Sequence, residues 1–435
     1  MEWPLLRLAL VVVAGALAPL VDTTVVNVAL PAMSADVHAG PAAIPWVATA
    51  YLLALAVTVP VTAWASDRFG TKRLWIAGLA LFLLGSGTCA LAWDFGSLVA
   101  FRALQGAGAG IMLPVLQTIL VRAAGPAKTG RVLTIVMLAG TVAPIAGPLV
   151  GGLVVDEVSW RWVFAINLPL CVAAILLAVR FVPHTPAQAG KQLDVPGVLL
   201  LGLGTAALLY ALGNTAVFWP PLLAGALLTA GFVAWSLARG TRSAIPVRLL
   251  ADKAFGSATA TLFLTGAALY GALFLLPLFF QQQRGLTALT AGAVLALQGV
   301  GSLLTRWTGG VVDRIGTRPI ATVGVLLCAA ATVPFAVAGA HTGWVLLGGA
   351  LVVRGGALSA VNIAITAGAF RGLAREQVPA GSAIVRLVQQ LGGAVGTALL
   401  ATVAAASGFH GAFLWSIGLM LVALVPCLAI PAKLS

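Results

Sequence analysis

The sequence predicts an all-α membrane protein with fourteen transmembrane helices, arranged as two pseudo-symmetric six-helix bundles with two further helices inserted between them. Three observations lead to this fold class. Of the 435 residues, 61% are hydrophobic and only 8% are charged, whereas about a quarter of the residues of a soluble domain are charged. The second observation is a series of apolar runs long enough to cross a bilayer, and the third is a motif that recurs in both halves of the chain.

Fourteen apolar runs follow one another along the chain, separated by polar connections. The hydrocarbon core of a bilayer is about 30 Å thick, so a helix needs roughly 20 apolar residues to cross it. Lipid offers no partners to backbone N–H and C=O groups, and we therefore expect each run to be helical. The runs cover approximately 6–31, 43–65, 74–93, 98–121, 133–154, 163–182, 196–214, 219–238, 258–280, 289–309, 319–339, 344–367, 379–402 and 411–431.

Basic residues in the connections predict how the chain is oriented. If the N-terminus is cytoplasmic, 18 Lys and Arg residues fall on the cytoplasmic side and only two, Arg161 and Arg284, fall outside. Cytoplasmic connections of membrane proteins carry an excess of Lys and Arg, so we expect both termini to be cytoplasmic. The net charge of +13 is spread among these connections rather than gathered on one face, and it therefore does not indicate nucleic-acid binding.

An internal repeat predicts the domain organisation. The sequence DRFGTKR (Asp67 to Arg73), after the second run, recurs as DRIGTRP (Asp313 to Pro319) after the tenth. Runs 1–6 therefore match runs 9–14, and two six-helix halves in parallel orientation are a known transporter plan. We expect an N-terminal bundle over 1–185, two inserted linker helices over 186–240 and a C-terminal bundle over 241–435.

Asp22 is the only acidic residue in the interior of any apolar run. Counted from Arg7 at the cytoplasmic edge, it lies about 22 Å into the membrane at 1.5 Å per residue. Arg102 lies at a similar depth, about 7 Å below the outer surface on the fourth run. A charge that faces lipid at mid-helix costs at least about 2.5 kcal/mol, so we expect Asp22 to face the protein interior with Arg102 as its partner. Such a pair could be an inert link between helices, or it could take up and release protons.

Six motifs follow one another in a characteristic order. They are VDTTVVNVALP in the first run, AWASDRFGTKR after the second, FRALQGAGAG in the fourth, GTVAPIAGPLVGG in the fifth, WRWVFAINLP at the start of the sixth and QQLGGAVG in the thirteenth. Together they make the chain resemble the major facilitator superfamily, specifically its 14-helix drug:proton antiporter branch, over nearly its whole length. The resemblance implies alternating access, in which the two halves rock around a central cavity.

The resemblance also implies roles for three groups of residues. Asp22 and Arg102 would couple transport to protons. Charges in the two repeated loops would act as gates, although basic residues there are also expected as topology anchors. Glycines and prolines of the fifth run form the antiporter motif of exporters, although small residues also serve ordinary helix packing. The gating residues are Asp67, Arg68, Asp313 and Arg314, and the antiporter motif comprises Pro144, Gly147, Pro148, Gly151 and Gly152.

Polar residues within the apolar runs are candidates for lining a substrate cavity, and each is as able to bond another helix as to touch substrate. Thr23 and Asn27 are four residues apart and so share the face near Asp22. Near helix ends, Trp46, Tyr51 and Phe280 are expected to be interfacial anchors. The cavity candidates are Thr23, Asn27, Gln105, Gln298, Arg354, Asn362 and Gln389.

These patterns favour proton-coupled efflux of drug-like or antibiotic-like small molecules across the plasma membrane. The alternative is a proton symporter that imports a small organic solute, and the GPLVGG sequence of the fifth run argues against it. The chain has no GxxxxGK(S/T) or HExxH motif, so neither direct use of ATP nor intramembrane hydrolysis is indicated, and we do not expect an enzyme. We expect no cofactor and no metal, with the proton gradient as the energy source. We also expect a monomer whose partners are its substrate, protons and the lipid bilayer.

Overall fold

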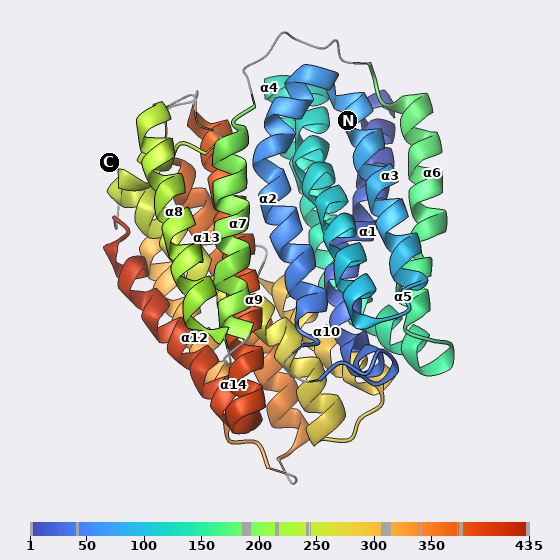
Figure 1. Cartoon of the computed structure of the whole chain (residues 1–435), viewed down its shortest axis with the longest axis vertical. Coiled ribbons are helices and arrows are strands. Elements are labelled where there is room, and N and C mark those ends of the chain that lie inside the picture. The colour runs from blue at the N-terminus through green and yellow to red at the C-terminus, as the bar shows by residue number, and fades with distance from the viewer. Residues whose placement is uncertain are drawn as a thin grey trace. The chain divides into compact units, whose positions relative to one another are not determined.

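The computed structural model is helical throughout the part of the chain that it describes, and no β-strand occurs there. The described part is every residue except 1–2, 41–42, 185–192, 214–216, 241–242, 244, 306–314, 340–341, 372, 374–376 and 432–435. For a further set of residues only the backbone is described, namely 4, 63, 125–141, 144, 371 and 378–379. Figure 1 shows the helices in chain order from blue to red. The N-terminal half contains α1 (Trp3–Asp36), α2 (Trp46–Phe69), α3 (Thr71–Ala90), α4 (Phe95–Glu157), α5 (Arg161–Ala165) and α6 (Asn167–Phe181).

The remaining elements follow in the second half of the chain. A 3-10 turn, η3 (Val247–Ala251), precedes α9, and a π-helical turn, η4 (Phe279–Gln283), follows it. The α-helices are α7 (Val195–Gly213), α8 (Trp219–Arg239), α9 (Lys253–Leu278), α10 (Ala288–Leu304), α12 (Thr317–Ala336), α13 (Trp344–Arg371) and α14 (Val378–Ala429).

Ten of the described helices are long and apolar enough to cross a bilayer, and the shorter helical stretches 46–62 and 288–304 are also apolar. Together with the composition, these helices make the chain an integral membrane protein. The predicted runs coincide with helices over their described residues, but α4 and α14 each cover two runs, and α5 and α6 divide the run 163–182. The count of fourteen crossings and the arrangement of six, two and six helices therefore stay predictions.

The 63 residues of α4 form two arms that run beside the same neighbour. Near its start, Arg102 contacts Asp22 of α1, and near its end Gly147 lies against Thr24 of α1. These two positions of α4 would be about 65 Å apart along a straight helix with a rise of 1.5 Å per residue. The backbone must therefore reverse direction between them, so the two arms of α4 are separate packing surfaces.

A break in α14 likewise separates its two predicted runs. Gly408 has φ 72° and ψ −176°, which is outside the helical region. Before the break, Gly392 and Gly396 pack closely on the backbone of α9. After it, the ring of Phe413 contacts Phe335 of α12. The two arms of α14 therefore have different neighbours.

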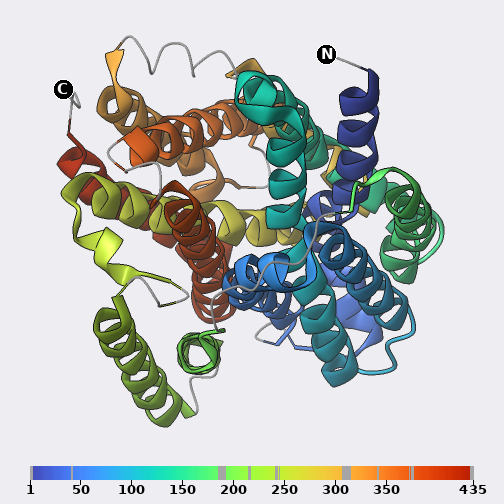
Figure 2. The same cartoon turned by 90° about the horizontal axis from the view of Figure 1, so that it is seen from above.

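The chain groups into two compact units. The N-terminal unit contains Met1–Ala39, Trp46–Leu193 and Thr287–Gly292, and the C-terminal unit contains Gly40–Pro45, Asp194–Leu286 and Ala293–Ser435. Helices α7 and α8 belong to the C-terminal unit, where α7 packs on α14 and α8 packs mainly on α7. Figure 2 shows the molecule from above, with many of its helices seen end-on. The predicted domain boundaries, with the two inserted helices as a segment of their own, stay predictions.

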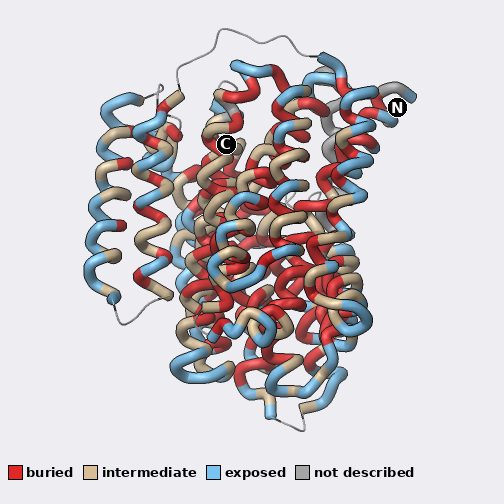
Figure 3. The backbone as a smooth tube through the Cα atoms, turned by 45° about the vertical axis from the view of Figure 1, so that its right-hand side comes forward, coloured by how far each residue is buried: buried red, intermediate tan, exposed pale blue. Residues whose placement is uncertain are grey.

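Buried residues, red in Figure 3, run along the inner faces of the helices. In the C-terminal unit the core includes a cluster of aromatic rings around Phe279. Phe280, which we expected to be an interfacial anchor, is fully buried in this cluster. It packs against Phe335 and stacks on Trp344. That expectation is wrong because the π-helical turn η4 carries this end of the helix into the aromatic core rather than toward the membrane surface.

The glycines of the two repeated sequences have similar backbone conformations. Gly70 has φ 82° and Gly316 has φ 91°, and each is the residue directly before a helix, α3 or α12. Residues with a side chain rarely adopt this backbone conformation, and only glycine does so without strain. The matched glycines set a common register: Ser86 and Thr332 each lie 16 residues after them, and Asp22 and Ala268 each lie 48 residues before them.

We predict that Gly70→Ala lowers the free energy of unfolding by about 1–3 kcal/mol, because alanine would be strained at this φ and ψ. Thermal unfolding of the detergent-purified protein measures the change. Gly418→Ala is the matched control, since a methyl group added there meets no other atom and alanine favours the helix. A Gly70→Ala protein as stable as the wild type would contradict the assigned turn.

Candidate functional site

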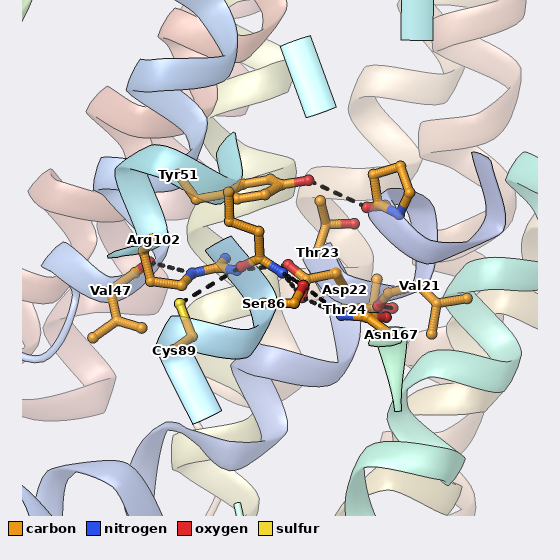
Figure 4. Close-up of polar contacts among 12 residues, drawn as sticks. Val21, Asp22, Thr23, Thr24, Val47, Tyr51, Ser86, Cys89, Arg102 and Asn167 are labelled. Atoms are coloured by element: carbon orange, nitrogen blue, oxygen red, sulfur yellow. Dashed lines mark hydrogen bonds and ion pairs between the residues drawn. The ribbon is translucent and has the colours of Figure 1, made fainter. Parts of the chain in front are cut away.

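A buried ion pair between Asp22 and Arg102 lies in the N-terminal unit. Nη1 of Arg102, from the first arm of α4, is 2.6 Å from Oδ2 of Asp22 on α1, and both side chains are at most 1% exposed. Figure 4 shows the two side chains pointing toward each other among the surrounding helices. The contact that the depth of the two residues predicted is thus present, whereas its role in proton coupling is a separate question.

The second carboxylate oxygen of Asp22 accepts two amide hydrogen bonds. Gln105 Nε2 donates to Oδ1 over 2.9 Å, and Asn167 Nδ2 donates to the same oxygen over 3.3 Å. Gln105 lies one turn after Arg102 on α4, and Asn167 is the first residue of α6. Donors from two helices, α4 and α6, therefore meet the two oxygens of this carboxylate.

Arg102 is held in place by contacts besides the ion pair. Its Nη1 also donates to Gln105 Oε1, and its Nε donates to the backbone oxygen of Val47 over 3.0 Å. Its guanidinium lies over the ring of Tyr51, 4.3 Å from the centroid, which is a favourable cation–π geometry. Tyr51 is 1% exposed, so the expectation that it anchors an interface is wrong. The side chain turns inward because it is a partner of the buried cation.

Ser86 closes the network on the side of α3. Its hydroxyl oxygen accepts hydrogen bonds from Gln105 Nε2 at 2.7 Å and Asn167 Nδ2 at 3.4 Å. Neither Ser86 nor Asn167 was among the residues predicted from the sequence. Asn167 lies in the WRWVFAINLP motif, which could have pointed to it, whereas a single serine in an apolar run has no distinguishing signal.

A proton on Asp22 would disrupt this arrangement. Oδ2 faces an N–H group of Arg102, so a proton on this oxygen sets two donors against each other. A neutral Asp22 also leaves the Arg102 charge without an anion, and removing one partner of a buried pair costs about 3–5 kcal/mol. The geometry is thus that of an ion pair whose two members depend on each other.

The glycines of the predicted antiporter motif lie against the helix that bears Asp22. A Cβ atom on Gly147 would lie only 1.9 Å from Thr24 Oγ1, and one on Gly151 would lie 3.1 Å from Val25. The second arm of α4 thus packs directly beside Asp22. Gly152 and Pro148 meet the start of α10 instead, at Ala288 and Gly292, and the side chain of Pro144 lies outside the described set.

The predicted gating charges show one ion pair. Arg122 Nη2 is 3.8 Å from Asp67 Oδ1, and both side chains are about half exposed. Arg68 is exposed, and Asp313 and Arg314 lie outside the described residues. Exposed pairs of this kind are worth at most about 1 kcal/mol, so this contact adds little to the stability of the fold.

The predicted cavity residues divide between the two units. In the N-terminal unit Gln105 joins the Asp22 network, while Thr23 and Asn27 bond to the backbone of α1 itself. In the C-terminal unit Arg354 Nη1 donates to Gln298 Oε1 over 2.9 Å. Asn362 accepts a weak bond from Thr366 on the same helix, and Gln389 lies on α14 where Gly266 of α9 packs against its backbone.

Comparison with known proteins identifies the family. The model of the Major Facilitator Superfamily matches residues 12–397. The chain is 35% identical over 407 residues to a Mycobacterium tuberculosis protein named multidrug resistance protein B homolog, covering 91% of this chain and 75% of that one. It is 31% identical over 388 residues to the putative multidrug resistance protein MdtD of Yersinia enterocolitica, covering 86% and 81% of the two chains.

A solved structure shares the fold. A mutant of the nucleoside transporter NupG superposes with a TM-score of 0.72 at 14% sequence identity, covering 98% of this chain and 99% of that one. At this identity the likeness concerns the fold alone. The sequence relatives and the family model, however, confirm the resemblance that the six motifs indicated. The chain belongs to the major facilitator superfamily and is a transporter, not an enzyme.

Proposed function

We propose that this transporter exports drug-like or antibiotic-like small molecules across the plasma membrane in exchange for protons, by alternating access between its two halves. The observation that carries the proposal is the buried pair of Asp22 and Arg102, in which Asp22 is the only acid within the apolar runs. An ionisable residue in the membrane interior is expensive and is typically part of a transport pathway. The names of the relatives, multidrug resistance proteins, support the class of substrate.

The proposed cycle turns on the protonation of Asp22. When the site opens to the outside, a proton binds Oδ2, the contact with Arg102 breaks and the substrate leaves. When the site opens to the cytoplasm, the proton leaves, Asp22 again pairs with Arg102 and substrate binds. Gln105 bonds to both members of the pair, so its amide group is placed to follow the change. The proton gradient is then the only energy source, and a chain with one intramembrane acid has a low proton stoichiometry.

Other parts of the molecule have supporting roles in the proposal. The glycines at Gly147 and Gly151 allow α1 and the second arm of α4 to stay in close contact while they move. Asp67 and its partner Arg122 open and close the cytoplasmic side together with the second copy of the loop. The transporter acts as a monomer. Both of its termini lie in the cytoplasm, an orientation that the distribution of Lys and Arg among the connections supports.

We predict that Asp22→Asn abolishes drug exchange driven by a pH gradient in proteoliposomes, because an amide cannot take up and release the coupling proton. Asp36→Asn is the matched control: Asp36 lies at the end of the same helix and pairs with Arg161 at 2.6 Å, but both side chains are partly exposed. Coupling should survive in this control. Full pH-driven exchange by Asp22→Asn would refute the role given to Asp22.

The direction of transport has its own test, which separates export from the alternative, a proton symporter that imports a solute. Cells that express the protein should accumulate less of a fluorescent drug than cells without it, because efflux opposes passive entry. Cells that express Asp22→Asn should accumulate as much as cells without the protein. Higher accumulation on expression of the wild type would instead favour import.

A further inference from the structure

Arg354 is a buried cation in the C-terminal unit that the proposed cycle does not use. It lies on α13 and is 1% exposed. Its Nη1 donates to Gln298 Oε1 over 2.9 Å, its Nη2 donates to the backbone oxygen of Ala268 over 3.0 Å, and its Nε donates to Thr332 Oγ1 over 3.4 Å. All three acceptors are uncharged.

The sequence supplies no carboxylate to this part of the membrane. Between Asp252 at the start of α9 and the end of the chain, the only acids are Asp313 and Glu376. Both lie in polar connections between apolar runs, and both lie outside the described residues. The interior of the helices around Arg354 therefore contains no acidic side chain that could serve as its counter-ion.

The surroundings of Arg354 resemble those of Arg102 in part. In the register set by Gly70 and Gly316, Ser86 of the first network corresponds to Thr332 of the second. Asp22 corresponds to Ala268 in the same register. In both units a glutamine side chain accepts a hydrogen bond from Nη1 of the arginine. The second network thus also joins an arginine, a hydroxyl and a glutamine, and it has alanine where the first has its acid. The glutamines come from different places, since Gln105 lies on the same helix as Arg102 and Gln298 lies on α10.

The missing acid leaves a charge that neutral acceptors do not balance. Hydrogen bonds to Gln298, Ala268 and Thr332 offset the loss of water around the N–H groups, but they do not neutralise the cation. A guanidinium has five N–H donors, and three of them have acceptors within the part of the chain that the structure describes. One N–H on each terminal nitrogen is left, and a carboxylate is the group that such a planar fork binds best.

We propose that Arg354 binds the carboxylate of an organic anion, which supplies the charge that Asp22 supplies to Arg102. An organic acid fits this position better than a small, strongly hydrated ion because apolar helices surround it and would contact the apolar body of the ligand. The inference rests on the proposed function in one respect, that the anion is a transported compound. Compounds with a carboxylate would then be favoured over matched neutral ones.

The test uses benzoate and its uncharged analogue benzamide as probes of the purified full-length protein in chloride-free buffer with methanesulfonate as counter-ion. A ligand that binds the folded state raises the melting temperature. Saturating benzoate should raise the Tm by about 2 °C or more, and benzamide should leave it unchanged. The benzoate effect should disappear in Arg354→Gln, which retains hydrogen-bonding capacity but has no charge.

A second pair of variants keeps the test decisive if Arg354→Gln fails to fold. Ala268→Asp introduces an acid at the position that corresponds to Asp22, so it should neutralise Arg354 and abolish the response to benzoate. Ala268→Asn has nearly the same shape without the charge and should keep the response.

Three results would overturn the proposal: no response of the wild type to benzoate, an equal response to benzamide, or an undiminished response in Ala268→Asp. A separate titration with chloride distinguishes the source of the anion. If chloride alone raises the Tm as far as benzoate does, the ligand of Arg354 is an inorganic ion and not an organic acid. Binding is measured without a proton gradient or transport. A negative result would therefore leave the export proposal standing, and failure of proton coupling in proteoliposomes would leave the binding result standing.

Discussion

The ion pair of Asp22 and Arg102 is the interaction on which the rest of the N-terminal unit depends. Two opposite charges that are both buried in a membrane protein require each other, because losing either one leaves the other without compensation. Their surroundings follow from this need: Gln105 and Asn167 bond the second carboxylate oxygen, Ser86 accepts from both amides, and Tyr51 covers the guanidinium. Two helices, α4 and α6, thereby contact the carboxylate, and two more, α2 and α3, contact the residues that bind it.

The close packing around this pair depends on glycine. The second arm of α4 can lie against Thr24 and Val25 only because Gly147 and Gly151 have no side chain. The same device joins α9 to α14, where Gly392 and Gly396 approach the backbone of Phe263 and Ala267. Lipid tails are as apolar as the side chains of the helices, so there is no hydrophobic gain when two helices associate in a membrane. Close backbone contact is therefore a main source of helix–helix stability there. The repeat in sequence is thus also a repeat in packing.

Much of this could be predicted from the sequence, and what could not has a physical cause. Run lengths located the helices, and the depths of Asp22 and Arg102 predicted their contact, because the rise per residue and the bilayer thickness are fixed. The two arms of α4 were expected as separate helices with a connection between them, and run lengths alone do not say how tightly the chain turns there. Ser86 and Tyr51 were missed as partners because their roles depend on which helices are neighbours, and a single sequence does not contain that information. The gating loop at Asp313 and Arg314 remains a prediction.

In the proposed cycle, Asp22 exchanges a proton for substrate. This exchange is tested by counting the protons that the purified protein releases when an exported drug binds. The measurement starts with Asp22 protonated and is made at constant pH in weakly buffered solution. The wild type is expected to release protons on binding, and this release should vanish at pH values where Asp22 is already ionised. Asp22→Asn should bind drug without releasing any protons. Equal proton release by the wild type and Asp22→Asn would contradict it.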